Sequence, residues 1–243
     1  MKAMIFAAGK GTRLKPLTDF CPKALIKVAE KPIIEHVILK LKAAGFTELV
    51  VNVHHLAEQI IEYLTTQDFG LTIHISDERN ELLETGGGLQ KAAPFFMNDK
   101  EGFLLHNADI LSNCNLQALM LDHHSHSSAL ATMVVSKRKT NRYLLFDEKQ
   151  FLRGWINKQT GETKPKGLIY QEGMYDEYAY AGIQAVSPRI CQSLPTGRFS
   201  IIDYYLSVCN EEEIRAFIEP DLKILDIGKP ETLEKAEQFV KEL

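Results

Sequence analysis

Short apolar runs alternate with helical patterns through the first half of the sequence, and this alternation restricts the fold more than any other feature. Apolar runs at 4–8, 49–53, 71–75 and 103–106 predict buried strands. Apolar residues at helical spacing predict helices at 32–45, 56–64 and 85–93, the last entered through three glycines. Strands separated by helices pair in parallel through right-handed crossovers. We therefore expect an α/β three-layer sandwich with a mostly parallel central sheet.

The rhythm changes after about residue 130, where strand-like runs follow one another with short polar connections. This pattern predicts a small antiparallel extension of the sheet. The polar stretch 157–176 is expected to be a mobile loop or flap. Later elements are expected as strands at 130–135, 143–146, 151–156, 178–186, 214–218 and 223–227, and as helices at 201–208 and 232–243.

Composition excludes several classes of protein. The 243-residue chain has a formal net charge of −4, which argues against a general nucleic-acid binder. No apolar run approaches the roughly 20 residues that span a bilayer, so no membrane partner is expected. The four cysteines are widely spaced without a CxxC pair, which disfavours a zinc knuckle. Free thiols without a signal peptide indicate a cytoplasmic protein, whereas the oligomeric state stays open.

A glycine-rich segment follows the first predicted strand. Two glycines let the backbone approach a bulky anion, and loop amides can point at phosphate oxygens. A dinucleotide-binding loop would need a third glycine where Leu14 stands, and a Walker A loop would need a GK[ST] sequence that is missing. A simple strand-to-helix turn is the remaining alternative. The expected phosphate-contacting residues are Ala7, Ala8, Gly9, Lys10, Gly11, Thr12 and Arg13.

Cations cluster just beyond the glycines. Arg13, Lys15 and Lys23 lie in one stretch that Pro16 and Pro22 stiffen. The prolines make a helix improbable, so the cations project from irregular backbone. Fixed cations suit a polyphosphate whose charge grows in a transition state, although a solvated basic loop is the alternative.

This segment resembles a known family. Residues 9–25 match the pattern GxGTRxxPxTxxxPKxL without a gap, which is the signature of sugar-1-phosphate nucleotidyltransferases. Four later segments are similar to family motifs: Leu83–Gly88, His106–Asp109, Tyr180–Ile183 and Leu225–Gly228. The resemblance implies a Rossmann-like nucleotide-binding fold and covers nearly the whole chain.

The resemblance also implies roles for residues outside the first loop. Arg13, Lys23 and Asp109 are expected to be catalytic. A second nucleotide-contacting loop would use Glu84, Thr85 and Gly87, where glycines let a flat base lie against the backbone. Sugar contacts are expected from Lys23, Asn107 and Gly182. Metal ligation is expected from Asp109 and Asp226.

The two aspartates have a physical rationale beside the resemblance. Asp109 follows the apolar run at 103–105 and Asp226 follows Ile224 and Leu225, so both are expected at carboxyl ends of strands, where open α/β sheets bind ligands. Two carboxylates that meet phosphates suit Mg²⁺, although a capping role is the alternative for each. Lys229 stands where the family has threonine, which puts local hydrogen bonding in question.

We therefore expect an enzyme that converts a nucleoside triphosphate and a sugar-1-phosphate to a nucleotide sugar and pyrophosphate. UTP with N-acetylmuramate-1-phosphate is the expected pair, and GTP with mannose-1-phosphate is the first alternative. A CTP-dependent phosphocholine transferase, a silent sugar-nucleotide sensor and a dinucleotide-dependent oxidoreductase remain as competing hypotheses. A single domain over 1–243 is expected, with a nucleotide half of about 1–110 and a sugar half of about 111–243.

Two histidine groups are weaker candidates. His123, His124 and His126 lack acids or cysteines at ligand spacing, so we interpret them as an exposed helix end. His54 and Asn52 follow or end a predicted strand, where a sugar contact competes with a purely structural role.

Overall fold

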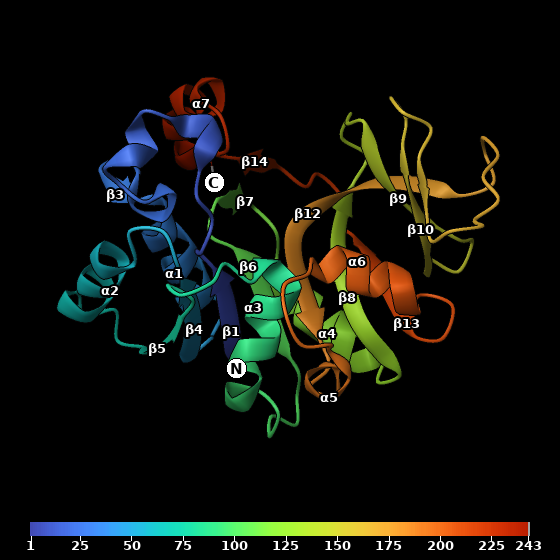
Figure 1. The fold of residues 1–243 in the computed structure, drawn as a ribbon, viewed down its shortest axis with the longest axis horizontal. Coiled ribbons are helices and arrows are strands. Elements are labelled where there is room, and N and C mark those ends of the chain that lie inside the picture. Colours follow the sequence, from blue (N-terminus) through green and yellow to red (C-terminus); the bar gives the residue numbers. More distant parts are fainter. Residues whose placement is uncertain (243) are drawn as a thin grey trace.

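The computed structural model describes residues 1–242 and shows three layers, with helices on both faces of a ten-stranded sheet (Figure 1). The main path of the sheet has the order β11-β10-β9-β12-β6-β1-β4-β5, and β8 and β13 branch from β12. Its strands are β1 (Lys2–Phe6), β4 (Glu48–Val53), β5 (Thr72–Asp77), β6 (Phe103–Asn107), β8 (Ala129–Ser136), β9 (Arg142–Phe146), β10 (Leu152–Asn157), β11 (Thr163–Lys164), β12 (Asp176–Val186) and β13 (Glu213–Ile218).

The parallel strands are the block β6-β1-β4-β5 and the pair β8-β13. The β6-β1-β4-β5 block carries the N-terminal half of the chain. Strand β12 joins it antiparallel to β6, and β9, β10 and β11 continue antiparallel from there. The expected α/β sandwich with an antiparallel extension is therefore confirmed. The helices are α1 (Ile33–Ala43), α2 (Ala57–Thr66), α3 (Glu84–Ala92), α4 (Leu116–Ser125), α5 (Ile190–Ser193), α6 (Ile201–Val208) and α7 (Pro230–Lys241).

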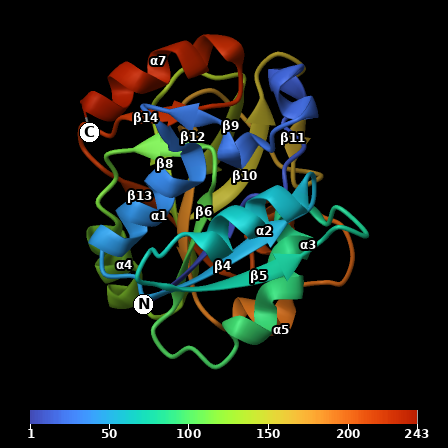
Figure 2. The ribbon, with the colours of Figure 1, turned by 90° about the vertical axis from the view of Figure 1, so that its left-hand side faces the viewer.

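Alternating strand residues contribute to two separate hydrophobic cores, because successive side chains of a strand point to opposite faces of the sheet. Ile5 and Val51 pack under α1, α2 and α4, whereas Met4 and Val50 pack under α3, α5 and α6. Figure 2 shows α1 and α4 on one side of the sheet and α3 and α5 on the other. No helix within residues 1–242 is long and apolar enough to cross a membrane.

Two small sheets lie outside the main one. Strands β2 (Lys27–Val28) and β3 (Lys31–Pro32) form one, and β7 (Ile110–Ser112) pairs antiparallel with β14 (Ile224–Asp226) in the other. A third apolar cluster joins Leu14, Leu111, Ile227 and Ala236, so α7 seals this region. The C-terminal helix thus begins two residues earlier than expected, at Pro230, and its expected end at Leu243 lies outside the described residues.

The stretch 157–176 is only partly a loop, which corrects the expectation of a free flap. Strand β11 lies within it and pairs with β10. Lys158, at its start, donates to Glu177 at 2.6 Å, and Tyr170, within it, donates to the same carboxylate at 2.6 Å. Because Glu177 belongs to β12, these contacts hold the stretch against the extension of the sheet.

The histidine run was expected to be exposed, and for His123 this is wrong. His123 lies in the last turn of α4, with its ring buried and hydrogen-bonded to Thr132 Oγ1 at 2.9 Å. The α4 helix must bury one face against β8, and His123 lies on that face. Burial, together with the charges of His124, Arg189 and His126, lowers the pKa of His123 to about 4.

This buried histidine predicts acid-sensitive stability. The folded pKa of about 4 lies below the ordinary 6.5, so the unfolded chain takes up the proton first as the pH falls. The free energy of unfolding is unaffected by this histidine above pH 6.5 and falls as the pH drops from 6.5 toward 4. The loss at pH 5 is about 1–2 kcal/mol. Urea unfolding at pH 7 and pH 5 should show a smaller loss in His123→Gln than in the unmodified protein. Equal losses in the two proteins would contradict the assignment.

Candidate active site

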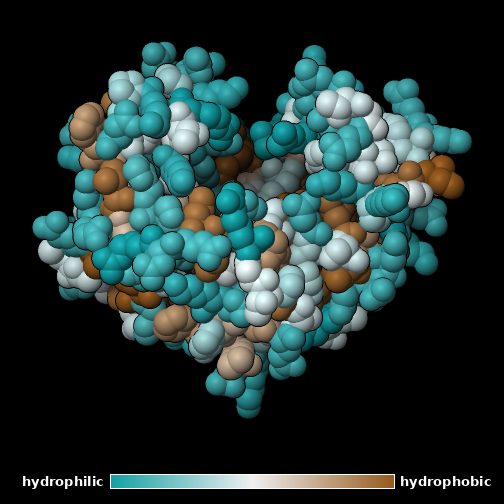
Figure 3. Space-filling model, in the orientation of Figure 1, coloured by the Kyte–Doolittle hydropathy of each residue, from teal (hydrophilic) through white to brown (hydrophobic). Residues whose placement is uncertain are grey.

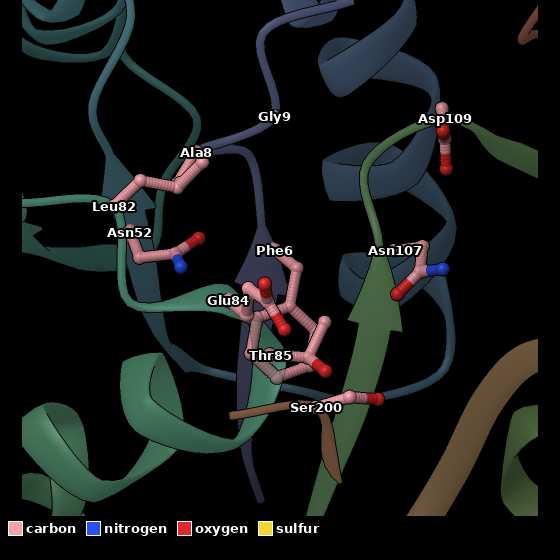
Figure 4. Close-up of a pocket in the computed structure, with 10 residues that line it drawn as sticks. All are labelled: Phe6, Ala8, Gly9, Asn52, Leu82, Glu84, Thr85, Asn107, Asp109 and Ser200. Atoms are coloured by element: carbon pink, nitrogen blue, oxygen red, sulfur yellow. The ribbon is translucent and has the colours of Figure 1, made fainter. Parts of the chain in front are cut away.

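The carboxyl ends of β1, β4 and β6 meet at one edge of the sheet, and a cavity of about 390 Å³ opens there (Figure 4). We call it the edge cavity. Parallel strands end together, so the loops that follow them converge. Its lining consists of Phe6, Ala8, Gly9, Asn52, Leu82, Glu84, Thr85, Asn107, Asp109 and Ser200. Six expected site residues therefore line one cavity: Ala8, Gly9, Glu84, Thr85, Asn107 and Asp109.

A buried network of hydrogen bonds connects the segments that line the edge cavity. The Ala7 amide donates to Asn52 Oδ1 at 2.8 Å, and Asn52 Nδ2 donates to Glu78 Oε1 at 2.7 Å. Glu78 also accepts from the Leu83 amide at 3.2 Å. Burial raises the pKa of Glu78, although its hydrogen bonds oppose the rise. The network ties the glycine loop to the start of α3.

Sequence reasoning did not find this network, although it considered Asn52 as a sugar contact. The amide of Asn52 is committed to the protein itself through Ala7 and Glu78. The available signal was the presence of two polar residues at the ends of neighbouring buried strands. A side chain at Gly88 would meet Glu78 Oε1 and Asn52 Nδ2, so glycine is required beside the pair.

The basic loop is held in a defined shape by its own polar groups. Gly11 has φ +62°, and its carbonyl accepts from Thr18 Oγ1 at 2.9 Å. His55 donates in turn to the Thr18 carbonyl at 2.9 Å. The loop forms three short 3₁₀ turns, Thr12–Leu14, Leu17–Asp19 and Lys23–Leu25, and no α-helix. Lys10 and Thr12 are exposed on this loop beyond the edge cavity.

One cation bridges the two expected metal-binding carboxylates. Lys23 Nζ pairs with Asp109 and lies 4.0 Å from Asp226 Oδ1, with only 11% of its side chain exposed. A small hollow of about 40 Å³ adjoins this pair, lined by Gly9 and Lys23 among others. The structure thus brings Lys23, Asp109 and Asp226 together at the rim of the edge cavity.

Asp226 reaches this cluster by a different route from the one expected. It ends no strand of the main sheet; the β7–β14 ribbon places it opposite Ile110, and the Ile227 amide donates to the Asp109 carbonyl at 2.9 Å. The ribbon pairs two three-residue strands that lie far apart in the sequence, so the apolar strand residues alone could not reveal the partner of β14. Lys229 is accommodated as well, since its amide donates to Thr232 Oγ1 at 3.2 Å.

The environment of Asp226 is electrostatically mixed. Burial raises the pKa of its carboxyl, and the Asp109 charge adds to the rise. The charges of Lys23, Arg13 and Arg138 act in the opposite direction. A side chain at Gly228 would meet both the Arg13 guanidinium and Asp226 Oδ1, so this glycine permits their approach.

The second expected nucleotide loop forms the first turns of a helix, in agreement with the helix expected at 85–93. Helix α3 begins at Glu84 and contains all three glycines. The amides of Gly86 and Gly87 both donate to the Phe199 carbonyl, at 2.9 and 3.3 Å. These amides are therefore occupied, and Gly87 does not line the edge cavity.

Gly86 and Gly87 of α3 allow the loop at 197–199 to pack closely against the helix. A side chain at Gly86 would collide with the Phe199 ring, and one at Gly87 would collide with the Gly197 carbonyl oxygen. The first residues of α3 are also bound to the same loop, because Arg198 Nε donates to Glu84 at 2.9 Å. Thr85 Oγ1 accepts from the Ile201 amide at 2.9 Å.

This packing makes a stability prediction. Gly87→Ala should lower the free energy of unfolding by about 1–3 kcal/mol, because the new methyl group meets fixed backbone. This is a net loss, because alanine by itself stabilises a helix by roughly 1 kcal/mol relative to glycine. Urea unfolding measures it, with Gln90→Ala on the same helix as the control for helix propensity. An unchanged or raised stability of Gly87→Ala would contradict the packing.

On the sugar side, Asn107 lines the edge cavity and Gly182 supports it from behind. Gly182 has φ +79° at a bulge of β12, and a side chain there would meet Asn107 Nδ2 and Ile110 Cγ1. Gly182 is buried and lines no part of the edge cavity. Because Gly182 has no side chain, β12 can pack closely against Asn107.

The donor set at Lys23 and its partners can be tested for its fit to a metal ion. No group of three or more His, Cys, Asp or Glu side chains at metal-binding distance occurs in residues 1–242. Asp226 Oδ1 is buried without a hydrogen-bond partner in that part of the chain. Two carboxylates with one unused oxygen fit Mg²⁺, which is commonly held by one or two carboxylates plus substrate phosphates.

A parallel α/β sheet with a glycine loop, fixed cations and paired carboxylates at its carboxyl edge defines an enzyme class that handles nucleoside phosphates. The family model described as nucleotidyl transferase matches residues 2–149. The chain belongs to this family, as the pattern at 9–25 predicted.

Curated relatives and solved structures agree with this membership. N-acetylmuramate alpha-1-phosphate uridylyltransferase of Neisseria meningitidis serogroup B is 34% identical over 206 residues, covering 82% of this chain and 88% of the relative. Mannose-1-phosphate guanylyltransferase 1 of Arabidopsis thaliana is 34% identical, covering 95% of this chain and 62% of the relative. HddC from Yersinia pseudotuberculosis, solved with GMP-PN, shares the fold at a TM-score of 0.77 and 20% identity, covering 98% and 99% of the two chains.

Proposed function

We propose that the protein transfers a nucleoside monophosphate from a nucleoside triphosphate to a sugar-1-phosphate and releases pyrophosphate. The observation that carries this proposal is the cluster of Lys23, Asp109 and Asp226 at the rim of the edge cavity. A cation between two carboxylates, beside a glycine loop, suits the meeting point of two phosphate-bearing substrates.

The proposed mechanism depends on positioning and electrostatics. The triphosphate lies along Ala7–Arg13, with the base toward Glu84 and Thr85 in the edge cavity. An oxygen of the sugar phosphate attacks the α-phosphorus, the bond to the β-phosphate breaks, and pyrophosphate leaves. The attacking oxygen is already an anion, so no general base is needed. Arg13 neutralises charge on the triphosphate, and Lys23 does so between the two substrates.

Asp109 and Asp226 would hold Mg²⁺, which supplies charge neutralisation at the α-phosphate when bound. Lys23 pairs with Asp109, so it orients that carboxylate beside the hollow that Gly9 also lines. Asn107 and Gly182 shape the sugar side of the same rim. In this proposal the segment of about 1–110 supplies the nucleotide side, and the rest of a single domain supplies the sugar side together with Asp226.

We propose UTP and N-acetylmuramate-1-phosphate as the substrate pair. Two relatives named for this reaction match most of their own length, and the second, from Caulobacter vibrioides, is 28% identical over 97% of this chain and 95% of the relative. The relatives named as mannose-1-phosphate guanylyltransferases extend well beyond the match, so GTP with mannose-1-phosphate is the second candidate. The four free cysteines favour a cytoplasmic site of action.

A pyrophosphate-release screen tests the proposal. Four nucleoside triphosphates are each combined with N-acetylmuramate-, mannose- and glucose-1-phosphate in the presence of Mg²⁺. The expected result is turnover that is highest with UTP and N-acetylmuramate-1-phosphate. Absence of pyrophosphate from every combination would overturn the proposed function, whereas turnover of another pair would overturn only the substrate assignment.

A further inference from the structure

A second cavity lies in the antiparallel extension and shares Ser200 with the edge cavity. We call it the extension cavity; its volume is about 440 Å³. Its principal side chains come from β9, β10 and β12 and from the segments beside them: Arg138, Arg142, Trp155, Lys164, Tyr180 and Asp203. Figure 3 shows a notch in the surface between the part that carries α7 and the part that carries β9 and β10. A ligand that reaches from the edge cavity toward the extension enters this second space.

Charge in the extension cavity is unbalanced. Lys164 is paired with Asp203 at 2.9 Å, so its charge is compensated. Arg138 and Arg142 have no carboxylate within ion-pair distance anywhere in residues 1–242. Both belong to the stretch 137–142, which carries four cations and no acid. Two uncompensated guanidinium groups therefore face the same cavity.

The two arginines differ in how firmly they are held. Arg138 Nη2 donates to the Tyr180 carbonyl at 3.1 Å, which directs its guanidinium along β12. Arg138 also lies near enough to the reaction cluster for its charge to act on Asp226. Arg142, at the start of β9, makes no side-chain hydrogen bond within the described residues. One guanidinium is thus fixed near the junction of the cavities, and the other keeps its donors for a ligand.

We propose that Arg138 and Arg142 bind a carboxylate on the sugar, so that the extension cavity selects acidic sugar-1-phosphates over neutral ones. A guanidinium presents paired donors that match a carboxylate, and such charge-assisted bonds are the strong ones. The inference rests on the proposed function and gives it a chemical reason, because N-acetylmuramate carries a lactyl carboxylate that N-acetylglucosamine lacks. The 1-phosphate stays at Lys23, and the second charge extends toward Arg142.

The test compares two matched pairs of substrates. N-acetylmuramate-1-phosphate is paired with N-acetylglucosamine-1-phosphate, and glucuronate-1-phosphate with glucose-1-phosphate. The measured quantity is the ratio of kcat/KM for the acidic member over the neutral one. Arg142→Gln and Arg138→Gln should each lower this ratio by about 10-fold to 100-fold. Lys139→Gln, on the same turn but outside the extension cavity, should leave the ratio within about twofold.

Binding gives a readout without turnover. Trp155 is the only tryptophan and lines the extension cavity, with Lys164 Nζ 5.5 Å from its ring. Its fluorescence should change on titration with N-acetylmuramate-1-phosphate, and Arg142→Gln should raise the dissociation constant about 10-fold or more. Equal losses for acidic and neutral sugars, or an unchanged ratio, would overturn the inference while turnover persists. Failure of the unmodified protein to turn over any pair would instead overturn the proposed function.

Discussion

Lys23→Gln should lower kcat for pyrophosphate release by about two to three orders of magnitude, which corresponds to about 3–4 kcal/mol of barrier. Lys23 Nζ pairs with Asp109 and lies 4.0 Å from Asp226 Oδ1, so its removal takes away a charge placed between the two carboxylates. Because the side chain is only 11% exposed, water cannot replace it fully. Steady-state kinetics at saturating Mg²⁺ and both substrates measure the effect.

Two controls separate chemistry from folding in this experiment. Lys23→Arg keeps the charge and should retain more activity than Lys23→Gln, although the planar group fits the site poorly. Lys15→Gln removes a cation of the same loop that pairs only with the exposed Asp19 at 2.9 Å, and it should have little effect. If Lys23→Gln kept kcat within a few-fold of the unmodified protein, Lys23 would not face the transferring phosphate.

Asp109→Asn and Asp226→Asn should each reduce kcat/KM about 10³-fold or more at low millimolar Mg²⁺, because charge neutralisation by a metal contributes several kcal/mol. Part of the activity should return at high Mg²⁺ concentration if the loss arises from metal affinity. Binding of Mn²⁺ in the presence of nucleotide, followed by electron paramagnetic resonance, gives a readout independent of turnover. Both variants should weaken this binding.

The matched control for these aspartates is Glu62→Gln, which removes an exposed carboxylate on α2 that lines neither the edge cavity nor the hollow beside Lys23. It should leave both Mn²⁺ binding and kcat/KM within about twofold. Normal Mn²⁺ binding in Asp226→Asn would reassign Asp226 to a purely structural role. Normal binding in both variants would remove this pair from the metal site.

The sequence predicted the parts of the site that depend on local pattern. A glycine loop after a buried strand and an aspartate after another buried strand must meet at a common edge once the strands are parallel. The positions of Gly9 and Asp109 follow from this rule, and both line the edge cavity. The cations of the loop could also be recognised, because prolines and glycines leave their backbone no regular alternative.

What could not be predicted depends on contacts between distant segments. Asp226 joins the site through a ribbon with β7, and no pattern in residues 224–226 names that partner. The helix at 85–93 was expected, but the reason for its glycines was not: the 197–199 loop packs where side chains at Gly86 and Gly87 would stand. The buried pair of Asn52 and Glu78 likewise requires knowledge of which strands are neighbours.

The β7–β14 ribbon affects the order in which the site is assembled during synthesis of the chain. The loop that carries Lys23 and the strand that precedes Asp109 are made early in synthesis, whereas Asp226 arrives only with the last strand, and α7 then packs over it. A growing chain that has not reached β14 already contains the edge cavity's parallel strands but lacks one of the two carboxylates. In such a chain Lys23 and Asp109 lack the second carboxylate, so the metal site that we propose is complete only once the ribbon has formed.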